Sequence, residues 1–165
     1  MKKLVIALIV LVSVAVTSFC IYDAMFYNAW PELKELPRFK SKEIYSVENF
    51  TDCTYYSKFT YKNVSVEDLK KAVESFEKVT EYNAEKIMNS ISEYESFISN
   101  INGMDEVRNA YDFDKSVVND GDYYYTESGE GFYQDEDGNF TDTGFITLYY
   151  FDIESQILYY FHNCI

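Results

Sequence analysis

The pattern of hydrophobic and polar positions divides the chain into three parts, over residues 1–22, 23–46 and 47–165. In the first part, the run from Leu4 to Tyr22 carries no charged residue, and a helix of that length nearly spans the hydrocarbon core of a bilayer. This run predicts a signal anchor or a signal peptide. We favour the uncleaved anchor, a single transmembrane helix, because no Ala-x-Ala cleavage site ends the run.

The charges that flank the apolar run bear on its orientation. A short positive head, Lys2-Lys3, is the usual shape of an export signal and favours a domain outside the cytoplasm. The second part of the chain holds both prolines and predicts a juxtamembrane stalk. The positive-inside rule favours the opposite orientation, since four basic residues lie in this stalk: Lys34, Arg38, Lys40 and Lys42. On balance we expect a single-pass membrane protein with its C-terminal domain outside the cytoplasm.

The segment that follows residue 64 has the spacing of helices. Ser65 predicts an N-cap, and Asp68 stands where a capping box has its acidic partner. Over residues 66–101 apolar side chains recur every three or four positions, which is typical of the core-facing side of a helix. Asn102-Gly103 predicts the C-terminal stop. One long helix and two helices that meet near Val79-Thr80 both fit this stripe, and we favour the break.

Strand patterns precede and follow these helices. β-forming residues with partial alternation occupy four segments: 50–62, 122–126, 145–151 and 156–162. A short polar loop separates the last two and predicts a hairpin, whereas residues 128–144 predict an exposed loop or a short hairpin. The element order predicts an α+β fold, with one or two helices packed on an antiparallel sheet of three to five strands. This order is similar to that of cystatin-like and NTF2-like folds, although no motif of either family is present.

Composition narrows the class of partners. The 165 residues include 14 basic and 28 acidic side chains, which gives a formal net charge of −14. After Gly103 the only basic residues are Arg108 and Lys115, so the acidity is concentrated in the last third of the chain. Such a charge repels the phosphate backbone, and we therefore expect no nucleic-acid partner.

Candidate catalytic residues are few. His162 is the only histidine, and at a strand end we expect it to have a structural role. The sequence has no phosphate-binding glycine loop and no HExxH, CxxC or GxSxG motif. We predict no catalytic residue and no cofactor. Whether the protein is an enzyme stays open, with a hydrolase that uses paired carboxylates as the alternative.

Two acidic clusters offer the oxygen ligands that calcium prefers. The first contains Asp112, Asp114, Asp120 and Asp122, and the second contains Asp135, Asp137, Asn139 and Asp142. The second does not fit an EF-hand loop, because Gly138 at the glycine position would put Tyr133 at the first ligand position. Turn chemistry explains both clusters better, so we predict no metal site.

Tyrosine is the most distinctive residue type, with 17 Tyr beside 13 Phe. Successive strand residues point to opposite faces of a sheet, so core packing accounts for about half of the tyrosines. The rest would offer an aromatic surface to a protein or envelope component. We name five candidate binding residues: Tyr124, Tyr149, Tyr150, Tyr159 and Tyr160. Cross-strand pairs that only stabilise the sheet are the alternative.

Two of the three cysteines are candidates for a disulfide. Cys20 lies in the apolar run, whereas Cys53 on the first predicted strand and Cys164 at the chain end would pair in an oxidising compartment. Two buried thiols are the alternative. The distance between the two Cα atoms distinguishes a disulfide from two thiols, since beyond about 7 Å the bond does not form without backbone movement.

The chain resembles small uncharacterised membrane-anchored envelope proteins of Gram-positive bacteria. The resemblance lies in the positive head with its apolar run, the tyrosine-rich strands and the closing segment YYFDIESQILYYFHN. The resemblance names no activity. We expect a non-catalytic binding or accessory module that uses an aromatic, acidic sheet surface, attached to the membrane through residues 4–22. An inhibitory or accessory subunit of another membrane protein is the alternative.

Overall fold

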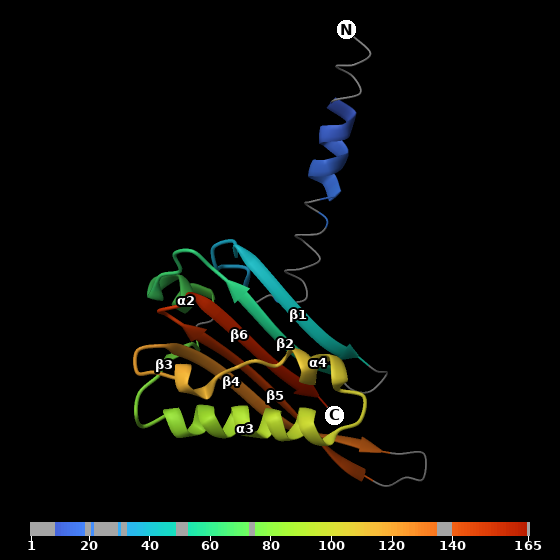
Figure 1. The fold of residues 1–165 in the computed structure, drawn as a ribbon, viewed down its shortest axis with the longest axis vertical. Coiled ribbons are helices and arrows are strands. Elements are labelled where there is room, and N and C mark those ends of the chain that lie inside the picture. Colours follow the sequence, from blue (N-terminus) through green and yellow to red (C-terminus); the bar gives the residue numbers. More distant parts are fainter. Residues whose placement is uncertain are drawn as a thin grey trace.

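A computed structural model of the chain describes residues 9–18, 21, 30, 33–48, 53–72, 75–134 and 140–164, with backbone only for 130–134 and 140–143. Within these residues the elements that follow the N-terminal helix form one α+β domain (Figure 1). Their order is β1 Ser41–Glu48, β2 Cys53–Thr60, α2 Val66–Ala72, β3 Glu77–Lys78, α3 Ala84–Asn100, α4 Asp105–Ala110, η2 Lys115–Val117, β4 Tyr123–Gln134, β5 Phe140–Asp152 and β6 Ile157–Cys164.

The sheet has six strands in the order β1-β2-β6-β5-β4-β3, and every neighbouring pair is antiparallel. The α+β class is therefore confirmed, whereas the expected count of three to five strands is wrong. Both extra strands lie at the edges of the sheet. The edge strand β1 reads SKEIYSVE, and such charged residues protect an edge while hiding its strand signal. The other edge strand, β3, is only two residues long.

The predicted break in the helical segment is confirmed, because β3 separates α2 from α3. The capping box of α2 is also present. The backbone N–H of Asp68 donates to Ser65 Oγ at 3.2 Å, and the backbone N–H of Ser65 donates to Asp68 Oδ2 at 3.0 Å. Beyond α3, Gly103 adopts a φ of 85°, a conformation that glycine reaches without strain.

One face of the sheet packs against α3 and α4, and we call this the helix-side core. Figure 1 shows α3 running across the strands, with α4 nearer β1 and β2. The apolar stripe predicted from the sequence is the buried side of α3: Ile87, Ile91, Tyr94 and Ile98. These side chains meet Tyr56, Tyr150 and Phe161 of the sheet. Burying each such side chain contributes about 1.5–3 kcal/mol.

The opposite face of the sheet carries a second core, which we call the stalk-side core. Leu33 and Leu36 are only 1% and 5% exposed there, and they pack with Leu69 of α2 on Phe59 and Leu158. Residues of the predicted stalk are thus part of the domain, contrary to our expectation. Because both faces of the sheet are covered, packing explains why its strands carry apolar side chains on both sides.

The predicted transmembrane helix is not shown by the structure. Residues 9–18 and 21 are helical and expose apolar side chains, among them Leu11 at 69%. The remaining residues of the predicted span, 4–8, 19, 20 and 22, lie outside the described residues. In the part of the chain that is described, no helix is both long and apolar enough to cross a membrane.

Candidate functional site

A groove of about 850 Å³ opens on the helix side of the sheet, between the C-terminal half of α3 and strands β4, β5 and β6. Its walls combine small polar side chains with apolar ones. The described lining consists of Glu93, Ser96, Phe97, Asn100, Ser128, Gly129, Gly144, Phe145, Ile146 and Asn163. Figure 1 shows the β4–β5 hairpin extending past the C-terminal end of α3.

The groove exists because the strands carry small residues where they face α3. Gly144 shares the helix-facing side of β5 with Ile146, two residues further on. Among the described atoms, the nearest to a Cβ atom added at Gly144 would be Gly129 O at 3.8 Å, so no described atom fills the space above it. On the opposite face, Gly129 lies directly across from Phe145, whose ring takes the room that a side chain would need.

Asn163 of β6 is the polar group at the buried side of the groove. Its side chain is 5% exposed, and its Oδ1 atom has no hydrogen-bond partner in the described protein. Across the strand pair, Thr54 faces Asn163 in the register of β2 and β6, and its buried Oγ1 also has no partner there. A buried acceptor without a donor costs about 1–3 kcal/mol. A hydrogen-bond donor that reached the Asn163 Oδ1 atom would remove this cost.

The remaining lining defines which ligands suit the groove. Glu93 is the only charged residue of the described lining, and Ser96, Asn100 and Ser128 add neutral hydroxyl and amide groups. Phe97 and Ile146 provide apolar contact. This combination favours a neutral or positively charged ligand that has hydrogen-bond donors and an apolar part. The described lining contains no second carboxylate, so it does not supply the pair that the hydrolase alternative requires.

The structure does not bring the five candidate tyrosines together on an open surface. Tyr124 and Tyr150 lie in the helix-side core, and Tyr149 and Tyr160 lie in the stalk-side core. All four are at most 8% exposed, and Tyr159 is half-buried against the helix-side core. The physical reason is that both faces of the sheet are covered, one by α3 and α4 and the other by α2 and residues 33–39.

The first acidic cluster is tied up in structural contacts. Asp112 accepts hydrogen bonds from Tyr56 and Lys58, and Asp122 accepts one from Tyr150. Asp114 accepts from the backbone of Ser116, and Asp120 lies 3.9 Å from Lys78. In the second cluster Asp135, Asp137 and Asn139 lie outside the described residues, as does the side chain of Asp142.

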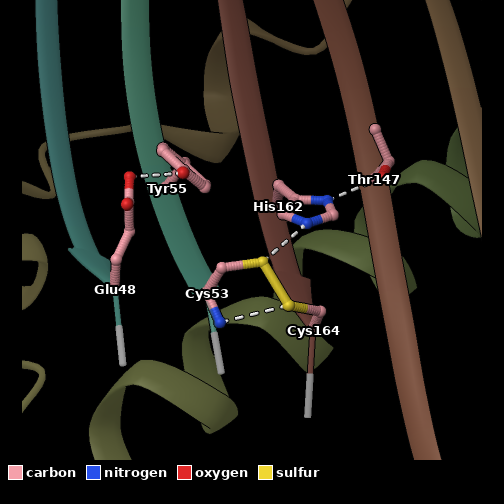
Figure 2. The surroundings of a disulfide bond; sticks show 6 residues. All are labelled: Glu48, Cys53, Tyr55, Thr147, His162 and Cys164. Carbon is pink, nitrogen blue, oxygen red and sulfur yellow. Dashed lines mark hydrogen bonds between the residues drawn. A yellow bond between two sulfur atoms is a disulfide. The ribbon is translucent and has the colours of Figure 1, made fainter. Parts of the chain in front are cut away.

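Cys53 and Cys164 form a disulfide that ties β2 to β6 (Figure 2). The two residues are direct partners in the strand register, and their Cα atoms are 5.2 Å apart, inside the limit we set. His162 lies beside the bond, with Nε2 at 3.3 Å from Cys53 Sγ and Nδ1 at 2.8 Å from Thr147 Oγ1. Burial lowers the pKa of His162 below its usual value, which favours the neutral ring.

Sequence reasoning overlooked both the groove and the Cys–His cluster. The cluster could have been predicted in part from the sequence, because His162 and Cys164 are two residues apart and therefore point to the same face of a strand. Gly129 and Gly144 gave weaker evidence for the groove, since glycine within a strand often marks a site where a ligand or another backbone approaches closely.

Comparison with known proteins gives no further guide to this site. No protein-family model, no curated protein and no solved structure matches the chain. The geometry of the described residues therefore carries the functional argument.

Proposed function

We propose that this protein is a non-catalytic binding module, held at a membrane by its N-terminal run, whose domain lies outside the cytoplasm and binds a peptide segment of a partner protein in the groove beside α3. The observation that carries the proposal is the unpartnered Oδ1 atom of buried Asn163 in that groove. An extended peptide has backbone N–H donors that would satisfy this acceptor.

Charge narrows the peptide further. Glu93 at the groove and the net charge of −14 attract a segment that contains Lys or Arg and repel an acidic one. Phe97 and Ile146 favour an apolar side chain close to that basic residue. The groove replaces the tyrosine surface as the binding surface in our account.

The membrane part of the proposal rests on the sequence and on side-chain exposure. The uncharged run Leu4 to Tyr22 follows Lys2-Lys3, and helical residues 9–18 expose apolar side chains to solvent. Exposed apolar side chains of this number are costly in water and stable in a bilayer.

A random peptide library, displayed and selected against the full chain, tests the proposed binding. We expect the selected peptides to combine a basic residue with an apolar one, and to lose binding to Gly144→Leu. The leucine side chain would extend from the helix-facing side of β5 into the groove, where no described atom fills the space above residue 144. Gly144→Ala is the matched control, because a methyl group fills little of that space.

Two results would overturn the proposal. One is a selection that yields no enriched sequence class. The other is a set of selected peptides that bind Gly144→Leu as well as the unmodified chain, which would place the binding surface elsewhere.

A further inference from the structure

Outside the groove, one cluster of potential ligand atoms stands out on the stalk-facing side of the sheet. The Sγ atoms of Cys53 and Cys164 and one ring nitrogen of His162 all lie within 4.8 Å of one another. We propose that these three residues form a binding site for Zn²⁺ that becomes available when the Cys53–Cys164 disulfide is reduced. This site is separate from the proposed peptide groove, which lies on the opposite face of the sheet.

The strand register fixes the positions of the three ligand residues before any metal binds. Cys53 and Cys164 are direct cross-strand partners, and His162 precedes Cys164 by two residues on the same face of β6. Two thiolates and one imidazole are a ligand set that zinc prefers, in tetrahedral geometry. Because paired strands hold the three positions, the site needs side-chain rotation but no backbone rearrangement.

His162 is held as a metal ligand would be held. Its Nδ1 lies 2.8 Å from Thr147 Oγ1, while Nε2 faces Cys53 Sγ at 3.3 Å (Figure 2). In the disulfide state Nε2–H donates to the sulfur and Nδ1 accepts from the Thr147 hydroxyl. After reduction the other neutral tautomer, with Nδ1–H donating to Thr147, would turn the Nε2 lone pair toward the two thiolates. Metal-ligating histidines generally have such a partner on the other ring nitrogen, which fixes tautomer and orientation.

A fourth ligand is available next to the cluster. Glu48 is the register partner of Cys53 on β1, so its side chain shares the face of the cysteine. Its carboxylate now accepts the hydroxyl of Tyr55, as Figure 2 shows. The Glu48 side chain is exposed, and either its carboxylate or a water molecule would complete the tetrahedron.

The chemistry balances with an external thiol or phosphine as reductant. The disulfide accepts two electrons and two protons and yields two thiols, and the reductant is oxidised by the same two electrons. Zn²⁺ then displaces the two thiol protons and binds both thiolates and the neutral imidazole. Oxidation by a disulfide or a peroxide releases the ion and restores the sulfur–sulfur bond, so the two states exclude each other.

The test uses the full chain with Cys20→Ser, so that only two cysteines remain. After reduction with a phosphine that binds zinc weakly, Zn²⁺ is titrated against a chromophoric chelator, and Co²⁺ serves as a spectroscopic probe. We expect the reduced protein to bind one equivalent of metal and to show a thiolate-to-cobalt charge-transfer band. Its melting temperature should be higher with zinc than without zinc. The oxidised protein should bind none.

Two variants separate a built site from two adjacent thiols. His162→Gln should lower the affinity for zinc at least about tenfold, and Thr147→Val should lower it by about tenfold because the imidazole loses its partner. Near-ultraviolet circular dichroism of the oxidised variants checks that the fold is kept. Absence of metal uptake by the reduced protein, or equal affinity in His162→Gln, would overturn the proposal.

Discussion

At the scale of single residues, the buried tyrosine hydroxyls are satisfied. Tyr56 donates to Asp112 at 2.7 Å, Tyr94 to Tyr55 O at 2.9 Å, and Tyr150 to Val117 O at 2.8 Å. Burial raises the pKa of all three phenols, so they stay protonated and act as donors across the physiological range. A core this rich in tyrosine is stable because its hydroxyls meet acceptors at its edge.

Tyr150 is the position where one hydroxyl matters most. It donates to the carboxylate of Asp122, which is only 5% exposed. Tyr150→Phe leaves that buried charge with fewer donors, and we expect the free energy of unfolding in urea to fall by about 1–3 kcal/mol. Tyr45→Phe is the matched control, since its hydroxyl bonds an exposed carboxylate and its loss should cost less. Equal losses for the two variants would contradict this assignment.

At the scale of elements, an ion pair fastens the segment after α4 to β2. Asp112 lies 2.7 Å from Lys58, and Lys58 also lies 3.1 Å from Glu43 of β1. Burial acts to raise the pKa of Asp112, but the hydrogen bonds from Lys58 and Tyr56 outweigh it and leave the pKa below the usual 3.8. A lowered carboxylate pKa stabilises the fold above pH 3.8, and this stability is lost as the pH falls through the folded-state pKa.

Asp112→Asn removes this source of acid sensitivity. The Asp112 side chain is 60% exposed, so solvent screening limits the expected loss at neutral pH to about 1 kcal/mol or less. Thermal melts from neutral pH to below pH 3.8 should show a smaller acid-induced drop for the variant than for the unmodified chain. Glu106→Gln, at an exposed position of α4, is the control for removing a charge. An unchanged acid slope in Asp112→Asn would show that the pair is not responsible.

How far the sequence predicts the elements depends on how much of each is buried. The stripe of α3 and the β5–β6 hairpin were predictable because burial imposes a regular period on them. The edge strand β1 was not, since Lys42, Glu43 and Glu48 hide its alternation. Leu33 and Leu36 were missed for a related reason: two apolar residues between prolines have no period.

The candidate site was less predictable than the fold. Asn163 looks like any polar residue at a strand end, and only the positions of α3 and the β4–β5 hairpin make it a buried acceptor beside an open groove. The prediction of a tyrosine binding surface also depended on tertiary packing that the sequence does not show. Their number suggested a surface, but tertiary packing on both faces of the sheet buries four of the five that we named and half-buries Tyr159.

At the scale of the whole molecule, the disulfide joins parts of the chain that are 111 residues apart. On the chain-entropy account, closing so long a loop stabilises the fold by about 5 kcal/mol. Cys53→Ser should therefore lower the urea midpoint of unfolding strongly, whereas Cys20→Ser should leave it unchanged. A Cys53→Ser midpoint equal to that of the unmodified chain would mean that the bond is absent or without effect.

The proposed location of the domain is also tested on the whole molecule. Protease added to intact cells or protoplasts should digest the domain, because the uncharged run behind Lys2-Lys3 is expected to export it. Fractionation should recover the undigested chain with membranes. A domain that resists protease until the membrane is broken would place it in the cytoplasm and reverse the predicted orientation.

We propose that Asn163 is kept for a ligand at the expense of stability. Asn163→Leu and Thr54→Val each remove a buried oxygen without a partner, from register positions that face each other. Both variants should be at least as stable as the unmodified chain. Only Asn163 lines the groove, so the two variants should differ in peptide binding.

The deciding measurement is the affinity of a library-selected peptide for these two variants, taken together with their free energies of unfolding. Our account predicts that Asn163→Leu loses at least about tenfold in affinity, equivalent to about 1.4 kcal/mol, while its stability is kept. It predicts that Thr54→Val keeps both. Unchanged affinity in a stable Asn163→Leu protein would contradict the assignment of the groove as the binding site.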